Sequence, residues 1–254
     1  MKPAAYLLID VSNSFTKLAL ASPTRLGRTH RIATAELTAA YLRRLLKQRD
    51  ARTVVISSVV PDRNTVIRSA TRPRRALWLS AKIKLGVGVE YPRPETIGAD
   101  RLANAAAVAV LYGCPAVVVD FGTAVTFDIV SERKCYIGGV IAPGLEAMTS
   151  FLYQRTALLP EITLKEPGSA VAKSTAAAMM AGAVYGYRGL VREILDRIRA
   201  ERFGHQRLRV VATGGYAHLI ARQLPQIQWV HPNLTLEGLR IVAGLNAPPG
   251  RLSR

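Results

Sequence analysis

The chain has 254 residues, of which 49% are hydrophobic and 20% charged, and its formal net charge is +18. This composition is typical of a globular protein with one large domain or two modest ones. No apolar run reaches the ~18 residues of a membrane span, and residues 1–5 lead into an apolar stretch without the long apolar region of a signal peptide. We therefore expect a cytoplasmic protein without a membrane partner.

The positive charge is concentrated in residues 1–85, where 17 Lys or Arg stand against 4 acidic residues, a net +13. Such a surface attracts nucleic acid, acidic partners or anionic substrates. No interleaved aromatic residues accompany the charge, and only Tyr41 and Trp78 fall near it. A solvated basic face therefore explains the charge better than nucleic-acid binding, which stays open as the weaker alternative.

The first half of the chain predicts a mixed α/β structure. Apolar runs indicate strands at 5–11, 15–21, 53–59 and 76–79. Helical spacing indicates a helix over 35–48, with an apolar side made of Leu37, Tyr41, Leu42, Leu45 and Leu46. The Gly- and Pro-rich stretch 86–97 predicts a loop, and the alanine-rich stretch 100–112 predicts a helix that ends before Gly113 and Pro115.

The second half continues in the same manner. Strand-like runs lie at 116–121, 124–130 and 135–142, and Ser131 to Lys134 form a hairpin turn between the last two. A helix over 143–155, an irregular stretch over 156–173 and a long helix over 174–202 follow, and Ser174 or Thr175 can cap the long helix. A strand at 207–212, a short helix, a strand near 227–230 and a helix over 235–246 complete the series.

Two segments about 110 residues apart share one design, in which an apolar run delivers Asp10 or Asp120 into a turn of small residues. A lone buried carboxylate is costly, and a metal ion or a phosphate–metal complex would offset that cost. Turn hydroxyls and N–H groups can hold phosphate oxygens. A plain hairpin with Asp in its turn is the alternative, but the duplication favours a phosphate clamp between two related α/β lobes, 1–113 and 114–254.

Further candidate residues lie where loops meet helices. Asp100 and Arg101 stand at a predicted helix start, either as an ordinary first-turn acid with a solvated arginine or as a general base beside an anion-binding arginine. Gly138 to Gly144 indicate close backbone packing or a ligand-facing loop. Thr213-Gly214-Gly215 suit either a strand–helix turn or the approach of a nucleotide to bare backbone.

Together these residues resemble the type III pantothenate kinases, over nearly the whole chain and in order. The family's Asp-x-Gly-Asn-Thr turn and Gly-x-Asp-Arg motif both have counterparts, the latter with the expected tyrosine seven residues earlier. The matching segments are Asp10-Val11-Ser12-Asn13-Ser14, Tyr91, Gly98-Ala99-Asp100-Arg101, Asp120-Phe121-Gly122-Thr123-Ala124, Gly138 to Gly144, Thr156-Ala157-Leu158-Leu159-Pro160, Ser174-Thr175 and Thr213-Gly214-Gly215.

The resemblance implies the fold of the actin/hexokinase/sugar-kinase superfamily, with two ribonuclease-H-like lobes of mixed sheet flanked by helices and an ATP cleft between them. It implies ATP-dependent phosphorylation of pantothenate to 4'-phosphopantothenate, the first step of coenzyme A biosynthesis. It also implies Mg²⁺, a monovalent cation (K⁺ or NH₄⁺) and a homodimer.

The resemblance also assigns site residues. Asp100 would be the general base, and Asp120 would bind the monovalent cation. The ATP-binding residues would be Asp10, Val11, Ser12, Asn13, Ser14, Phe15, Thr16, Lys17 and Thr123. The pantothenate site would consist of Tyr91, Gly98, Ala99, Asp100, Arg101 and Thr175.

The chain departs from the family pattern at Ser12, which replaces a glycine, and at Ser14, which replaces a threonine but keeps the hydroxyl. If position 12 needs a positive φ, serine is strained there; if it does not, the added hydroxyl can bind phosphate. A transcriptional accessory factor that associates with nucleic acid on the same fold is the alternative function, because the basic N-terminal part would suit it.

Overall fold

The structure is a computed structural model that describes residues 6–47, 51 and 53–247. It contains two compact units, the first formed by residues 1–112, 134–137 and 233–254 and the second by 113–133 and 138–232. Each unit has its own core and its own sheet, and the C-terminal helix belongs to the first unit. The predicted lobes 1–113 and 114–254 stay a prediction about domains.

The first unit contains a five-stranded mixed sheet in the order β3-β2-β1-β4-β5. Its strands are β1 (Tyr6–Val11), β2 (Phe15–Ala21), β3 (Leu26–Ala33), β4 (Thr53–Ser58) and β5 (Arg75–Trp78). The first three strands pair antiparallel, whereas β1, β4 and β5 run parallel to one another. The central strand β1 is buried along its whole length, because it packs on both faces.

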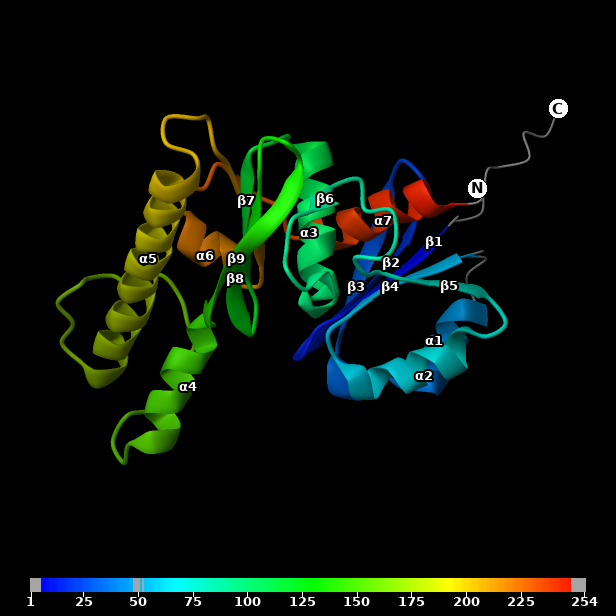
Figure 1. The fold of residues 1–254 in the computed structure, drawn as a ribbon. Helices are drawn as coiled ribbons and strands as arrows, with labels where there is room; N and C mark the ends of the chain where they lie inside the picture. Colours follow the sequence, from blue (N-terminus) through cyan, green and yellow to red (C-terminus); the bar gives the residue numbers. More distant parts are fainter. Residues whose placement is uncertain (1–5, 48–50, 52, 248–254) are drawn as a thin grey trace. The chain divides into compact units, whose positions relative to one another are not determined.

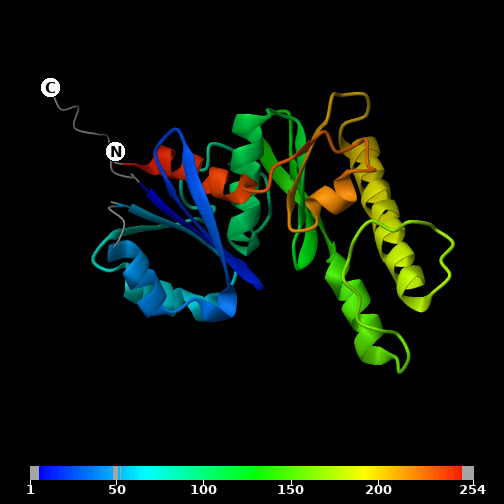
Figure 2. The same ribbon diagram turned by 180° about the vertical axis from the view of Figure 1, so that it is seen from behind.

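Helices cover both faces of this sheet (Figure 1). The apolar side chains of α1 (Ala39–Lys47) and α2 (Pro61–Thr71) share one buried core with Leu7, Ile9 and Val11 of β1. On the other face lie α3 (Ala99–Leu111) and α7 (Leu234–Asn246), which Figure 2 shows from behind. These two helices pack closely, since a Cβ atom at Gly238 would lie 2.0 Å from the Ala103 carbonyl oxygen.

Short elements connect these parts of the first unit. They are the 3₁₀ turns η1 (Thr34–Glu36) and η2 (Pro94–Thr96) and the two-residue strand β6 (Gly88–Val89). The strand β6 pairs in parallel with Cys135 and Tyr136, the first residues of β9, which also belong to this unit.

The second unit repeats the strand order of the first. Its strands are β7 (Ala116–Phe121), β8 (Ala124–Val130), β9 (Cys135–Pro143), β10 (Arg209–Gly214) and β11 (Trp229–Val230). Together with β6 they form a six-stranded sheet in the order β11-β10-β7-β8-β9-β6. The hairpin partner β8 is antiparallel to β7, and β10 and β11 are parallel to it. If β6 is left aside and the strands of each sheet are numbered from β1 and from β7, both sheets have the order 3-2-1-4-5.

The helices of the second unit are α4 (Leu145–Arg155), α5 (Thr175–Arg202) and the short α6 (Ala217–Ala221). The irregular stretch between α4 and α5 is as predicted. The fold class is therefore confirmed as mixed α/β with two mixed sheets flanked by helices. Within the described residues, no helix combines the length and hydropathy needed to cross a bilayer.

Besides the short elements β6, η1 and η2, two longer elements are absent from the sequence-based prediction, β3 and α2. The strand β3 has partly exposed residues of both kinds and no alternation, because it lies at the edge of its sheet. The helix α2 is mostly polar and buries only Ile67, Ala70 and Thr71, so its helical periodicity is weak. The predicted ends Ala5 and Gln48 lie outside the described residues.

Candidate active site

The first Asp-ended hairpin is built as predicted. Asp10 is the penultimate residue of β1, is 5% exposed, and pairs across the hairpin with Lys17 of β2. The turn between the strands closes with a 3.2 Å hydrogen bond from the Ser12 N–H to the Phe15 carbonyl oxygen. A buried carboxylate beside an ammonium-bearing position gives a site that suits a phosphate–metal complex.

The turn is fixed from outside by Thr34, the first residue of η1. The Thr34 hydroxyl donates to the Ser12 carbonyl oxygen at 2.7 Å and lies 3.0 Å from the Thr16 hydroxyl. The Thr34 N–H donates to the Ser14 carbonyl oxygen at 3.0 Å. These contacts hold the turn in one shape. Sequence reasoning missed Thr34, because it lies in a segment with no recognisable motif.

Ser12 is not strained. Among the described residues other than glycine, only Lys134 has a positive φ. The corresponding residue of the second turn is Gly122, and a Cβ atom there would meet its nearest neighbour, the Ala124 carbonyl oxygen, at 3.4 Å. Both turns therefore accept a side chain at this position, and the departure from the family's glycine is compatible with the backbone.

Cationic side chains line β2 and β3 next to this turn. Arg31 of β3 pairs in register with Lys17, and its guanidinium lies 3.4 Å above the ring of the exposed Phe15. The charged guanidinium therefore stacks on the face of the ring in a cation–π contact. The predicted ATP-binding run 10–17 thus lies beside two positive charges.

Asp100 lies in the first turn of α3, where the helix dipole favours an ionised carboxylate. Its Oδ1 accepts a 2.8 Å hydrogen bond from the Arg101 N–H. A Cβ atom at Gly98 would lie 2.6 Å from the same oxygen, so glycine leaves the space that the carboxylate occupies. The Gly98–Arg101 motif therefore positions one carboxylate at the start of a helix.

Tyr91 and Arg101 meet at the same buried ring, that of Tyr136. The ring centroids of Tyr91 and Tyr136 are 6.2 Å apart, and the Arg101 guanidinium lies 5.7 Å from the Tyr136 centroid. Tyr136 is fully buried, whereas Tyr91 is exposed. The structure thus brings together two predicted substrate-binding residues of the first unit. Sequence reasoning missed Tyr136, which lies in a strand and carries no motif signal.

The second Asp-ended hairpin belongs to the second unit. Asp120 of β7 pairs with Thr126 of β8. The turn closes with a 3.1 Å hydrogen bond from the Gly122 N–H to the Ala124 carbonyl oxygen, and the Gly144 N–H donates to the Thr123 carbonyl oxygen at 3.1 Å. A Cβ atom at Gly144 would lie 2.3 Å from that carbonyl oxygen. Gly144 therefore serves close backbone packing that supports Thr123.

The Thr213-Gly214-Gly215 segment ends β10 beside the same hairpin. Thr213 pairs in register with Asp120. Gly214 has a φ of +92°, and a Cβ atom there would lie 2.5 Å from the Phe121 carbonyl oxygen. At Gly215 a Cβ atom would meet nothing within 4 Å. Gly214 is thus needed for the turn itself, while Gly215 leaves backbone exposed.

Thr175 is the first residue of α5 and is exposed. The helix is capped by Ser174, whose Oγ accepts a 3.3 Å hydrogen bond from the Ala177 N–H. The capping role belongs to Ser174 rather than Thr175. A cavity of about 960 Å³ lies between the irregular segment and the start of this helix, with Ser174 in its wall.

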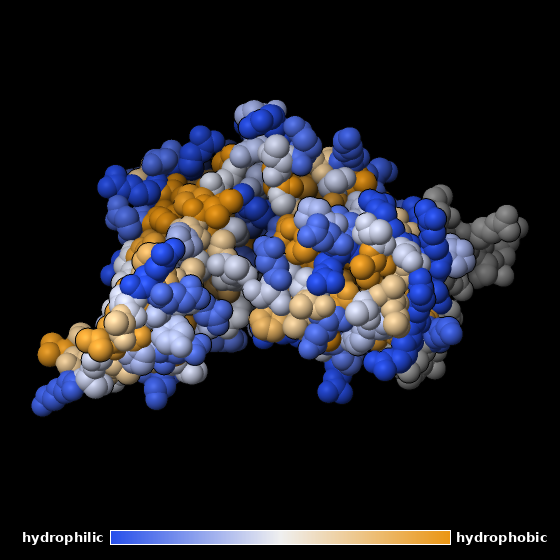
Figure 3. All heavy atoms as spheres, turned by 90° about the horizontal axis from the view of Figure 1, so that it is seen from below, coloured by the Kyte–Doolittle hydropathy of each residue, from blue (hydrophilic) through white to orange (hydrophobic). Residues whose placement is uncertain are grey.

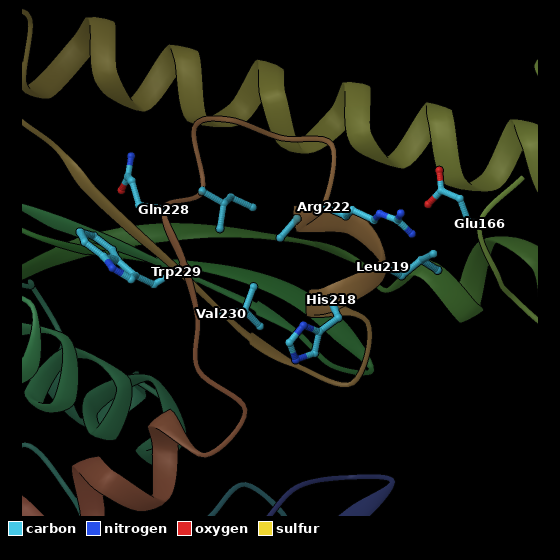
Figure 4. A pocket seen from close by; sticks show the side chains of 9 residues that line it. Glu166, His218, Leu219, Arg222, Gln228, Trp229 and Val230 are labelled. Carbon is cyan, nitrogen blue, oxygen red and sulfur yellow. The ribbon is translucent and has the colours of Figure 1, made fainter.

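Another cavity, of about 510 Å³, lies in the second unit around α6 and contains none of the predicted site residues (Figure 4). At its edge Glu166 accepts hydrogen bonds of 2.9 and 2.6 Å from the buried Arg188, which also donates to the Leu219 carbonyl oxygen. The Arg188 side chain lowers the pKa of Glu166, chiefly through this hydrogen bonding. Arg188 therefore ties the irregular segment to α6, which is a structural role.

In the first unit, arginine side chains of the basic surface contact aromatic rings of the same unit. The guanidinium of Arg68 lies 4.2 Å from the Trp78 ring centroid, and that of Arg44 lies 5.7 Å from the Tyr41 ring centroid. These are the two aromatic residues that could have stacked on nucleic-acid bases. Their contacts with arginine favour a solvated basic face.

Comparisons with known proteins agree with this picture. Residues 6–197 match the family model described as type III pantothenate kinase. A type III pantothenate kinase from Akkermansia muciniphila is 49% identical over 95% of this chain and 99% of its own length.

Solved structures share the fold at low identity. A protein from Campylobacter jejuni assigned to the Baf family of transcriptional activators has a TM-score of 0.62 at 18% identity, covering 93% of this chain and 96% of its own. One from Sinorhizobium meliloti, assigned as a 2-dehydro-3-deoxygalactonokinase, has a TM-score of 0.59 at 15% identity, covering 94% and 98%. Such neighbours have the fold of the actin and sugar-kinase ATPases. On the strength of the sequence match, the chain belongs to the type III pantothenate kinase family.

Proposed function

We propose that this chain transfers a phosphoryl group from ATP to pantothenate and forms 4'-phosphopantothenate, the first step of coenzyme A biosynthesis. The observation that carries the proposal is the repeated turn: five strands of each sheet share one order, and in each an aspartate is the penultimate residue of the first strand. Phosphoryl transfer needs mainly positioning and charge stabilisation, which two such turns can supply.

Asp100 is the general base of the proposed reaction. It lies in the first turn of α3, where a carboxylate interacts favourably with the helix dipole, and a general base accepts the proton of the attacking hydroxyl as a carboxylate. The Arg101 N–H and the space left by Gly98 fix the position of Oδ1. The carboxylate is therefore preorganised before the substrate arrives.

We assign pantothenate binding to Tyr91, Gly98, Ala99, Asp100, Arg101 and Thr175, as the family resemblance implies. Arg101 can bind the substrate's carboxylate with its guanidinium. Tyr136 supports both Tyr91 and Arg101 from behind, so it acts as a positioning residue.

ATP is bound by the run from Asp10 to Lys17 and by Thr123, with Mg²⁺ as the phosphate-bound metal. The buried Asp10 carboxylate and the neighbouring Lys17 fit a phosphate–metal complex, because they offer one charge of each sign. Asp120 holds a monovalent cation, K⁺ or NH₄⁺. When bound, these ions neutralise phosphate charge.

The proposed assembly is a homodimer in the cytoplasm. The second unit exposes large apolar side chains on α4, α5 and the neighbouring segments, and Figure 3 shows apolar side chains at the surface in this part of the molecule. They are Ile141, Met148, Phe151, Leu152, Tyr153, Leu158, Val171 and Tyr185. Large apolar side chains exposed on one unit in this number favour an interface between subunits.

The test of the activity is product formation from pantothenate and ATP with Mg²⁺ and K⁺ present, followed by mass spectrometry of 4'-phosphopantothenate. Asp100→Asn should retain the fold and pantothenate binding but lose about 10²–10⁴-fold in kcat, the usual effect of removing a general base. Native protein that forms no product at high ATP overturns the function. A variant with near-native kcat overturns only the role of Asp100.

The test of the dimer compares two exposed apolar residues. Phe151→Asp in α4 should convert the native dimer into a monomer in light scattering. Val110→Asp in α3, where the side chain is similarly exposed but lies outside the apolar surface, should leave the mass unchanged. A monomeric native protein, or dimers for both variants, would contradict the proposed interface.

A further inference from the structure

Two buried hydroxyl groups occupy equivalent places in the two units. Ser57 of β4 pairs in register with Asp10, and Thr213 of β10 pairs in register with Asp120. Residues in register on parallel neighbours point to the same face of a sheet. In each unit, therefore, a hydroxyl of the fourth strand lies on the same face as the aspartate of the first strand.

Neither hydroxyl is satisfied by the protein. Ser57 is 0% and Thr213 is 1% exposed, and within the described residues neither side-chain oxygen has a hydrogen-bond partner. An unsatisfied buried hydroxyl costs about 1–3 kcal/mol. Native structures rarely contain such groups without a bound water, an ion or a functional reason. Their occurrence at the same position in both sheets indicates a ligand rather than a packing defect.

The two aspartates differ in their neighbours on the adjacent strands. We call the residues in register across three strands a row. Thr126 lies on the other side of Asp120, so the second unit has the row Thr126–Asp120–Thr213 on β8, β7 and β10. The corresponding row of the first unit is Lys17–Asp10–Ser57. The second row contains only oxygen atoms as polar groups, whereas the first contains a fixed ammonium group.

Hard cations take oxygen ligands such as carboxylates and neutral oxygens. The described residues contain no group of three or more His, Cys, Asp or Glu side chains placed to hold a metal ion, so an ion at Asp120 would need other oxygen ligands. The two threonine hydroxyls of its row are in the right register to supply them. In the first row the residue paired with Asp10 is Lys17, which carries a positive charge of its own.

We propose that the hydroxyls of Thr213 and Thr126 are ligands, together with Asp120, of the monovalent cation, and that Lys17 makes the first row unsuited to such an ion. The proposal rests on the proposed kinase function for the presence of the cation. Beyond that function, it names two further ligands of the ion and explains why only one of the two similar turns binds it.

The test uses the full chain and measures thermal unfolding in KCl and in choline chloride at equal ionic strength, with a non-hydrolysable ATP analogue and Mg²⁺ present. The native protein should be stabilised by K⁺. Thr213→Val should be as stable as the native chain or more stable in choline, because an unsatisfied buried hydroxyl is removed. Its half-saturating K⁺ concentration should rise about tenfold or more, since one ligand of a charged group is lost. Thr213→Ser should restore the native K⁺ response.

The opposite pattern overturns the proposal. A Thr213→Val variant that is less stable in choline but responds to K⁺ like the native chain would show that the hydroxyl serves the fold or binds water. If Thr213→Val does not fold, the same assay is applied to Thr126→Val and Thr213→Ser. A half-saturating K⁺ concentration equal to the native value in Thr126→Val would contradict the role of the threonine hydroxyls as ligands.

Failure of the kinase proposal would look different. It is a native protein that makes no 4'-phosphopantothenate, whatever the K⁺ response of the variants. Absence of any K⁺ effect on the unfolding of an active native enzyme contradicts the cation row alone.

Discussion

The turn after β1 and the turn after β7 have the same design but different details. The first is one residue longer, since Val11 pairs with Thr16 whereas Phe121 pairs with Val125. A threonine hydroxyl from η1 supports the first turn, and the Gly144 backbone supports the second. Repetition of the sheet therefore preserves the place of the aspartate, while local contacts give each turn a separate support.

The rows beside the two aspartates differ in charge. Lys17 stands next to Asp10, and Thr126 stands next to Asp120. A fixed ammonium group attracts phosphate oxygens and repels a free cation, whereas hydroxyl oxygens can coordinate one. One side chain per row thus distinguishes the two ligands that we propose for the two turns.

The largest effect should follow from removing the support of the second turn. Gly144→Ala places a Cβ atom 2.3 Å from the Thr123 carbonyl oxygen, which is backbone and cannot move aside cheaply. We expect a loss of about 1–3 kcal/mol or more in the free energy of unfolding, measured by urea denaturation. Gly122→Ala is the matched control in the same turn, because its Cβ has ordinary contacts. Equal stability of the two variants would contradict the structural role of Gly144.

An intermediate effect should follow from exchanging the charge of the second row. Thr126→Lys copies the ammonium of the first row beside Asp120, so the variant should no longer respond to K⁺. Kinase activity measured in KCl and in choline chloride should then be equal, whereas the native enzyme should be activated by K⁺. Thr126→Met is the control for side-chain length without charge. A Thr126→Lys variant that keeps the native K⁺ activation curve would contradict the claim that an ammonium group beside the aspartate excludes the cation.

The smallest effect should follow from exchanging the side chains at the second turn position. Ser12→Gly should bind ATP no more weakly than the native chain, because the turn already supplies N–H donors and gains from closer approach. Gly122→Ser should fold normally, since its backbone has no positive φ. Calorimetric titration with an ATP analogue checks both. Binding several-fold weaker in Ser12→Gly, a loss of about 0.5–1.5 kcal/mol, would show that the Ser12 hydroxyl is a phosphate ligand.

The sequence predicts the parts of this fold whose burial is regular. The run before Asp10 and the run before Asp120 are buried throughout, so their apolar residues are continuous and both strands are recognisable. The edge strand β3 and the polar helix α2 lack such a signal, because they bury few side chains. The residues of the candidate site are predicted for a different reason, because they lie in short sequence motifs that can be recognised along the chain.

Residues that act through long-range contacts are not readable. The support that Thr34 and Tyr136 give to the site depends on packing between distant segments. The position of Thr213 beside Asp120 depends on strand register. No local pattern carries that information. Ser57 and Thr213 are equivalent only because β4 pairs with β1 and β10 pairs with β7.

The most direct test of the account measures two constants in two variants, Asp10→Asn and Asp120→Asn, while following formation of 4'-phosphopantothenate. We expect Asp10→Asn to raise the KM for MgATP and to leave the half-activating K⁺ concentration near its native value. We expect Asp120→Asn to raise the K⁺ constant or abolish K⁺ activation, with a smaller change in the KM for MgATP at saturating K⁺. If both variants alter the same constant to the same extent, the two turns do not have separate ligands and the account is wrong.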